Sequence, residues 1–302
     1  MGMSALNLTT IPNTVKELEN ELNFDTHSID NNGDTLSVTV YPNNNKETVI
    51  LLHGGPGVPD DLVEVVTLLS CGYQVVTFHQ RGTKQSPCRS NDYSMKAYVS
   101  DIDTVASYFG LRTFHLFGHS WGGLYAQVYA QQNSERLLSL FLCSTGSGTN
   151  DQWKTTESEV MTFNKSKTTS AEWMVLGINS LLGMLGSDNA YRKLFKQVII
   201  NYNKGYSSSP HGINFDNVKA LSINRTRKEI LEYPMLTDVP SPTFKITIVY
   251  GDNDIYGGSK IFVMNRFPTA GIHNIENCGH FPWLHNPSAF RALLAGHFNS
   301  ST

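Results

Sequence analysis

One serine lies in a sequence pattern that is typical of a catalytic nucleophile. Residues 118–122 spell GHSWG, a match to G-x-S-x-G, and a further glycine follows at position 123. An apolar run over Thr113–Phe117 precedes this motif, and a helix-like stretch over Trp121–Gln132 follows it. A sharp turn from strand to helix strains the serine, and glycines two residues to either side let the neighbouring backbone pass. The pattern therefore predicts that Ser120 is a nucleophile.

A serine hydroxyl is a weak nucleophile, so it needs a base and an acid that orients the base. After a nucleophile in this kind of turn, the expected chain order is serine, acid, histidine. Asp252 and Asp254 both follow the apolar run Ile246–Tyr250, at the carboxyl end of a predicted strand. We expect Asp252 to hold the turn through its side chain and Asp254 to be the orienting acid.

The candidate base lies near the carboxyl end of the chain. His280 follows a glycine within residues 278–283 (CGHFPW), in a loop after the predicted strand Gly271–Glu276. His285 is close to it, but His285 begins the approach to a predicted closing helix over Pro287–Phe298. His280 is therefore the predicted general base.

A glycine-rich loop completes the predicted site. Residues 53–57 (HGGPG) directly follow the predicted strand Thr48–Leu52, and glycines let backbone amides approach a ligand closely. The amides of Gly55 and Trp121 are predicted to bind the oxyanion of a tetrahedral intermediate. A phosphate-binding loop is the rival interpretation, but the loop has neither G-x-G-x-x-G nor a Lys-Ser/Thr pair. The site implies no metal and no organic cofactor.

The segments that must position these residues alternate between two patterns. Amphipathic stretches predict helices, for example over residues 93–109 with Asn91 or Asp92 as the cap. Continuous apolar runs are typical of strands that are buried on both faces of a parallel sheet. These runs cover residues 48–52, 74–78, 113–117 and 138–142. The alternation predicts an α/β fold with a mostly parallel central sheet flanked by helices.

The alternation begins after a predicted β-hairpin, residues 22–29 and 35–41, and it stops near Ser147. Residues 147–242 show no convincing strand pattern, and we interpret them as a mainly helical lid. A strand pattern resumes over Thr243–Tyr250. We therefore expect a core over residues 1–146, a lid over 147–242 and the second part of the core over 243–302.

Bulk composition narrows the functional class. The chain has 302 residues, of which 40% are hydrophobic, and a formal net charge of −3, which favours neither nucleic acid nor membrane as a partner. No run approaches the roughly 20 apolar residues of a membrane span, and residues 1–23 lack the regions of a secretory signal. The four cysteines have no zinc-like spacing. We expect reduced, mostly buried thiols and a cytoplasmic location.

The motifs as a set resemble the proline iminopeptidase branch of the α/β-hydrolases. They are HGGPG at 53–57, QRG at 80–82, GHSWGG at 118–123, GDND at 251–254 and CGHFPW at 278–283. The resemblance runs through Thr48–Thr145 and Thr243–Phe298, and it implies the α/β-hydrolase fold with a serine triad. The sequence departs from the family at His79, where an aspartate is usual, and at Lys84, where a glycine is usual.

Three functions remain open for a substrate that is a small molecule or a short peptide. Members of this family that remove N-terminal proline hold its ammonium with lid glutamates, and an aminopeptidase needs such an acidic cluster facing Ser120. A carboxylesterase, lactonase or amidase would have an apolar pocket, because burying an unmatched ammonium is costly. A ligand-binding protein that keeps the triad without turnover is the third possibility. The lid offers Glu157, Glu159, Glu172, Glu229 and Glu232.

Overall fold

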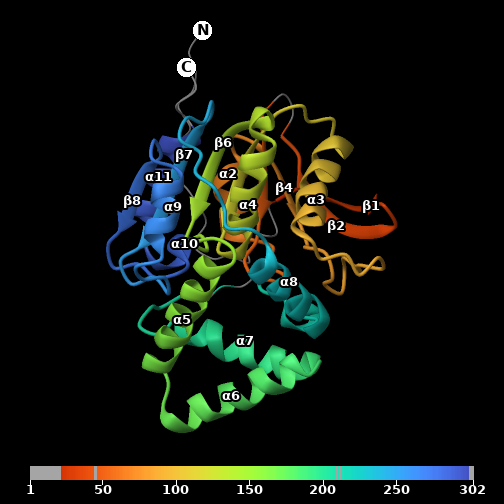
Figure 1. The fold of residues 1–302 in the computed structure, drawn as a ribbon. Helices are drawn as coiled ribbons and strands as arrows, with labels where there is room; N and C mark the ends of the chain where they lie inside the picture. The colour runs from red at the N-terminus through yellow and green to blue at the C-terminus, as the bar shows by residue number, and fades with distance from the viewer. Residues whose placement is uncertain (1–21, 44–45, 209, 211, 299–302) are drawn as a thin grey trace.

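A single twisted sheet runs through the molecule (Figure 1). The computed structural model describes residues 22–43, 46–208, 210 and 212–298, so the prediction about a secretory signal falls almost wholly outside it. Within the described residues, eight strands have the order β1-β2-β4-β3-β5-β6-β7-β8. They are β1 (Asp25–Asn31), β2 (Asp34–Tyr41), β3 (Thr48–Leu52), β4 (Gln74–Phe78), β5 (Phe114–His119), β6 (Leu137–Cys143), β7 (Lys245–Gly251) and β8 (Gly271–Ile275).

Strands β3 to β8 pair in parallel, whereas β2 pairs antiparallel with both β1 and β4. The mostly parallel sheet predicted from the apolar runs is confirmed. All five residues of β3 are buried, as expected for a strand covered on both faces. The predicted hairpin is β1–β2, and its turn is at Asn32 and Gly33, which both have positive φ. Asparagine followed by glycine suits this two-residue turn.

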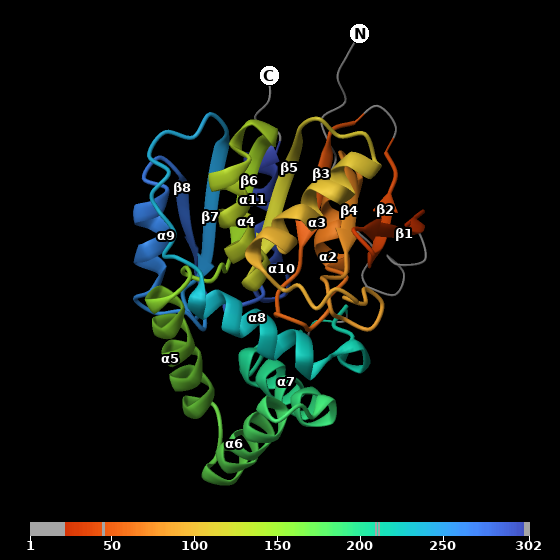
Figure 2. The same cartoon turned by 45° about the vertical axis from the view of Figure 1, so that its right-hand side comes forward.

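Side chains that alternate along β5 show which helices cover each face of the sheet. The Phe114 ring lies 5.8 Å from that of Tyr129 in α4 (Trp121–Gln132), whereas the His115 ring lies 5.4 Å from that of Phe298 in α11 (Pro287–Phe298). Successive side chains of a strand point to opposite faces, so α4 and α11 lie on opposite sides of the sheet (Figure 2). The helices around the sheet are α2 (Val63–Ser70), α3 (Met95–Tyr108), α4 (Trp121–Gln132), α9 (Lys260–Arg266), α10 (Pro282–His285) and α11 (Pro287–Phe298).

The predicted cap of α3 was wrong by two or three residues. Ser94 is the N-cap, because its hydroxyl accepts a hydrogen bond from the Ala97 amide at 3.1 Å. Asp92 lies two residues before Ser94 and accepts a hydrogen bond from the Ser94 amide at 2.9 Å. Serine and aspartate are both good caps, so composition alone could not distinguish them.

Residues 147–242 form a helical insertion between β6 and β7, beyond the edge of the sheet where the parallel strands end (Figure 2). We call this segment the helical insertion. Its helices are α5 (Asp151–Ser166), α6 (Ser170–Met184), α7 (Asp188–Tyr202) and α8 (Ala220–Glu232), with a short 3₁₀ turn, η2 (Phe215–Asn217). The predicted helical character is confirmed, whereas its separation as a domain with these limits stays a prediction.

The cysteines are only partly as expected. All four are free thiols, but Cys143 and Cys278 are buried while Cys88 is half-buried and Cys71 is exposed. Across the described part of the chain, no helix is both long enough and apolar enough to span a membrane.

A buried ion-pair cluster joins the hairpin to the loop that follows β4. The Arg81 guanidinium donates to Asp101 at 2.8 and 2.6 Å and to Asp34 at 3.1 Å. All three side chains are almost completely buried. Asp34 comes from β2 and Asp101 from α3, so Arg81 connects three segments that are distant in sequence.

We expect Arg81→Met to lower the free energy of unfolding by about 3–5 kcal/mol, because it leaves two buried carboxylates without their cation. Lys154→Met is the matched control, because Lys154 pairs with Asp151 at 2.7 Å on the exposed surface of α5. Lys154→Met should lower the free energy of unfolding by less than about 1 kcal/mol. Urea unfolding measures both, and equal losses in the two variants would refute the structural role of Arg81.

Candidate active site

Ser120 lies in the tight turn between β5 and α4, with φ 54° and ψ −118°. Positive φ is unfavourable for a residue with a side chain, so close packing must hold it there. A Cβ added to Gly122 would lie 2.2 Å from the Leu52 carbonyl oxygen, and one added to Gly118 would lie 2.7 Å from the Gly123 Cα. Only glycine fits at these two positions, which explains their spacing around the serine.

The structure brings Asp254 and His280 into contact. The loop after β7 carries Asp254, the loop after β8 carries His280, and 2.9 Å separates Asp254 Oδ1 from His280 Nδ1. Burial alone would raise the pKa of Asp254, but the charge and the hydrogen bond of His280 outweigh burial and lower this pKa below its ordinary value. Asp254 is therefore a carboxylate at neutral pH, able to fix the tautomer of His280.

The nearby alternative residues have other partners. Asp252 accepts hydrogen bonds from the amides of Asn277 and Cys278, both at 2.9 Å, and so joins its loop to the one that carries His280. His285 accepts from the Gly279 amide at 3.0 Å and stacks on Tyr206 with ring centroids 3.6 Å apart. Burial lowers the pKa of His285 to about 4, so it is neutral and supports the His280 loop.

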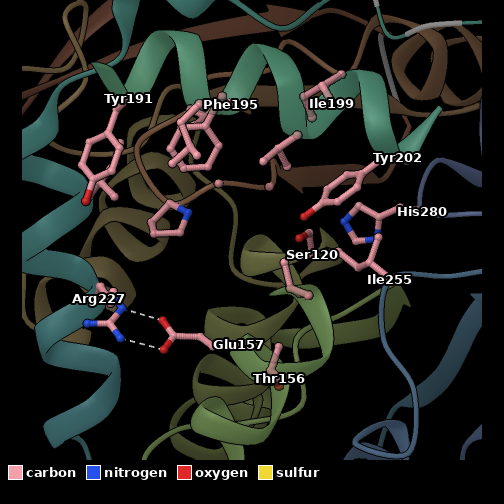
Figure 3. A pocket seen from close by; sticks show the side chains of 18 of the residues that line it. Ser120, Thr156, Glu157, Tyr191, Phe195, Ile199, Tyr202, Arg227, Ile255 and His280 are labelled. Carbon is pink, nitrogen blue, oxygen red and sulfur yellow. Dashed lines mark hydrogen bonds and ion pairs between the residues drawn. The ribbon is translucent and has the colours of Figure 1, made fainter. Parts of the chain in front are cut away.

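Two tyrosines next to the predicted triad were not found from the sequence. The Ser120 hydroxyl hydrogen bonds with the Tyr256 hydroxyl at 3.2 Å. The ring of Tyr202, from α7, lies 5.2 Å from the ring of His280. Figure 3 shows Ser120 and His280 side by side, with Tyr202 next to them. Tyr256 follows Asp254 by two residues and shares its loop, whereas nothing in the sequence around Tyr202 indicates this position.

Gln80 connects the two loops that carry the predicted oxyanion amides. Its side chain donates to the His53 carbonyl at 2.7 Å and accepts from the Trp121 indole at 3.0 Å. Gln80 is fully buried. The amide of Trp121 is the first of α4 and has no acceptor within that helix, and Gly55 lines the same pocket as Ser120. Gln80, the first residue of the QRG motif, therefore holds the glycine-rich loop against the serine turn.

A pocket of about 470 Å³ opens next to Ser120 and His280. The helical insertion covers it, mostly with apolar side chains from α5 and α7 (Figure 3). These are Val160, Met161, Leu194, Phe195, Val198 and Ile199. Apolar walls with few polar groups are usual in sites that bind small molecules.

Glu157 is the one of the five insertion glutamates that lines the pocket, and its charge is already paired. The Arg227 guanidinium donates to both of its carboxylate oxygens, at 2.6 and 2.7 Å (Figure 3). The Trp153 indole donates to the same carboxylate at 2.9 Å. This two-point pairing is the strongest form of the contact between an arginine and a carboxylate.

The other four glutamates of the insertion have local roles or are exposed. Glu159 accepts from the amides of Gly257 and Ser259, and Glu172 completes the capping box of α6. Glu229 accepts from the Met95 amide at 3.1 Å, and Glu232 is exposed beside Lys228. The acidic cluster facing Ser120 that an aminopeptidase would need is therefore not formed by these residues.

Asp60 is the other carboxyl group that lines the pocket. Its Oδ1 accepts from the Leu62 amide at 3.0 Å, and no hydrogen bond joins Oδ2 to any residue that the structure describes. Burial, followed by the charges of Glu64 and Asp61, raises the pKa of Asp60 to about 7 despite the bond from Leu62. At neutral pH this group is therefore divided between its acid and its carboxylate form.

Comparison with known proteins identifies the family of the chain. A family model described as alpha/beta hydrolase fold matches residues 47–287. The chain therefore belongs to the α/β-hydrolase family, and hydrolysis is the activity that its relatives support.

The relatives of this chain include the proline iminopeptidases of two bacteria. The protein of Clostridium botulinum is 34% identical over 105 residues, 33% of this chain and 36% of the relative. The protein of Lactobacillus helveticus is 32% identical over 106 residues, with the same shares of the two chains. The matched segment therefore spans about a third of these relatives, and their whole activity does not transfer with it.

Solved structures show the same fold across nearly the whole chain. VinJ has a TM-score of 0.68 at 16% identity and covers 92% of this chain and 99% of VinJ. The carboxylesterase CesB from Bacillus subtilis has a TM-score of 0.63 at 13% identity and covers 95% and 96% of the two chains. At this identity the likeness establishes the architecture alone.

The raised pKa of Asp60 predicts a pH-dependent gain in stability for Asp60→Asn. The native state keeps a proton that the unfolded chain loses above its ordinary pKa of 3.8, so this carboxyl destabilises the fold as pH rises towards about 7. Asparagine keeps the acceptor for Leu62 without this cost. We expect the variant to gain more at pH 8 than at pH 5, by about 2–3 kcal/mol in urea unfolding. The exposed change Asp151→Asn is the control, and a gain independent of pH would contradict the prediction.

Proposed function

We propose that this protein is a serine hydrolase that cleaves esters of apolar small molecules through an acyl-enzyme intermediate. One observation carries the choice of substrate: Glu157, the glutamate of the insertion that lines the pocket, is already paired with Arg227, and most of the other lining side chains are apolar. An ammonium group buried beside Glu157 would find its charge already paired and would be disfavoured. An apolar acyl or alcohol group would instead be bound by burial of its surface.

In the proposed first step, the Ser120 hydroxyl leaves its hydrogen bond with Tyr256 and forms one with His280. Its oxygen then attacks the carbonyl carbon of the ester. His280 takes the hydroxyl proton on Nε2, because Nδ1 is bonded to Asp254. The amides of Gly55 and Trp121 stabilise the oxyanion that forms. His280 then gives the proton to the leaving alcohol as the bond between the acyl carbon and its oxygen breaks.

In the second step, water attacks the acyl group on Ser120. His280 accepts a proton from the water, and the same two amides bind the second oxyanion. Collapse of this intermediate breaks the bond to Ser120 Oγ, which regains the proton from His280, and releases a carboxylic acid. Asp254 stabilises the imidazolium in both steps, since it remains a carboxylate throughout.

Aminopeptidase activity on short peptides is the second candidate. The names of the relatives and one feature of the pocket favour it: Asp60 has an oxygen without a hydrogen-bond partner among the described residues. A substrate ammonium at this oxygen would favour the carboxylate form of Asp60. This arrangement would replace the glutamates with which members of the family bind the N-terminus.

We expect Ser120→Ala and His280→Ala each to lower kcat by at least about 10³-fold, and the double variant to lose no more than either single variant. Residues that act as one unit show this lack of additivity, whereas independent residues would multiply their losses. Steady-state hydrolysis of p-nitrophenyl butyrate measures it, with circular dichroism to show that the variants fold. Wild-type rates in Ser120→Ala would refute the mechanism, and acylation of Ser120 without turnover would indicate a ligand-binding protein.

The ester proposal predicts substrate preference. We expect kcat/KM for short-chain p-nitrophenyl esters to exceed that for prolyl and alanyl p-nitroanilides by about tenfold or more. Arg227→Met should raise kcat/KM for alanine p-nitrophenyl ester relative to its N-acetylated form, because it frees the Glu157 charge. Arg227→Lys retains a cation and is the control. Cleavage of the free-amine anilides by the wild type, lost in Asp60→Asn, would instead establish the aminopeptidase.

A further inference from the structure

The outer face of α6 is an exposed apolar surface that no part of the proposed reaction uses. Six of its side chains are between 45% and 77% exposed, and they recur at steps of three and four residues along one side of the helix. They are Met174, Val175, Ile178, Leu181, Leu182 and Leu185, and we call them the outer stripe. A contiguous apolar surface of this kind on a protein marks a site of interaction.

The contacts that α6 makes within the chain use its other side. Leu176 is buried, and a Cβ added to Gly183 would lie 2.3 Å from the Tyr191 ring of α7. The carbonyls of Gly183 and Met184 also accept hydrogen bonds from Asn224 of α8. Figures 1 and 2 show α6 at the tip of the helical insertion, farthest from the sheet. The outer stripe therefore faces away from the molecule.

Lysines and arginines outnumber acids in the sequence that flanks α6, although two of these cations, Arg192 and Lys196, contact η2. Residues 165–204 carry six lysines and arginines but only Glu172 and Asp188 as acids, although the whole chain has a net charge of −3. The Glu172 carboxylate accepts a hydrogen bond from the amide of Thr169, the N-cap of α6. Asp188 pairs with Lys219 at 2.9 Å. An apolar helix face flanked by cations is the pattern of a segment that lies on an anionic lipid surface.

The outer stripe is continuous with the pocket. Met184 of α6 and Met161 of α5 both line the pocket, and both are more than half exposed. Met184 also adjoins Leu185, the most exposed residue of the outer stripe. Apolar surface therefore extends from the tip of α6 to the pocket that contains Ser120.

We propose that the outer stripe docks the protein on the surface of an anionic phospholipid membrane. The cations flanking α6 approach the lipid phosphates, and the apolar side chains enter the boundary between headgroups and acyl chains. Because Met161 and Met184 extend this surface to the pocket, a lipophilic ester dissolved in the membrane reaches Ser120 from there. This second part rests on the proposed esterase function, whereas docking itself does not.

A second copy of the chain is the other occupant to consider. Two insertions packed through α6 would bring the cations that flank α6 in one copy towards those of the other, and like charges repel. An anionic surface instead matches both the apolar side chains and the charge. The overall net charge, from which no membrane partner was expected, conceals this local excess.

The test is co-sedimentation of the Ser120→Ala variant with phosphatidylcholine vesicles that either contain or lack phosphatidylglycerol. Using this variant separates docking from hydrolysis, so that either can fail alone. We expect binding to the phosphatidylglycerol vesicles only, weakening as salt is added. Leu181→Glu should lower this binding about tenfold or more, since it places a charge within the outer stripe.

Ile261→Glu is the matched control, because Ile261 is a similarly exposed apolar residue on α9. We expect it to bind vesicles as Ser120→Ala alone does. Introduced into the active enzyme, Leu181→Glu and Ile261→Glu should each leave hydrolysis of a short soluble ester unchanged, because neither Leu181 nor Ile261 lines the pocket. Vesicle binding that survives Leu181→Glu would overturn the proposal. So would a dimer, seen by light scattering, that Leu181→Glu dissociates.

Discussion

The site depends on one steric constraint: at the carboxyl ends of the central strands, two backbone segments pack together with no space for a side chain between them. The end of β3 and the start of α4 come so close that Gly122 has no room for a Cβ beside the Leu52 carbonyl. Ser120 is consequently held at positive φ, a strain of order 1–3 kcal/mol that the surrounding buried strands must offset. The same approach places the Trp121 amide at the helix start, and Gln80 connects the loop of Gly55 to it.

Much of this arrangement was predictable because its signals are local. Glycine spacing indicated the turn at Ser120, and apolar runs indicated the strands before it. Asp254 and His280 lie 26 residues apart, yet both follow strands of a parallel sheet, and the carboxyl ends of such strands share one edge. The cap of α3 was misplaced because several good capping residues precede the helix within four positions. Local signals therefore predict which residues lie together at the ends of the strands, but they do not locate every helix boundary.

The contacts on which the proposed choice of substrate rests were not predictable in this way. Glu157 and Arg227 are 70 residues apart on different helices, and no periodicity or charge spacing indicates that they pair. Tyr202 reaches His280 only because α7 crosses the end of the sheet. The sequence offered five glutamates of the insertion as candidates for an ammonium site, whereas in the structure the one that lines the pocket is already paired with Arg227. Availability of a charge depends on its partners, which come from tertiary packing.

The apolar side chains of α6 are divided between two surfaces of the insertion. Met184 faces the pocket, whereas Leu181 and Leu185 point away from the molecule. When a helix is apolar on both sides, any surface that covers its outer side removes apolar side chains from water and so lowers the free energy. Because α6 also contributes to the pocket, such a surface would stabilise the insertion in the arrangement that builds the pocket. Docking and the formation of a substrate site would then be linked through one helix.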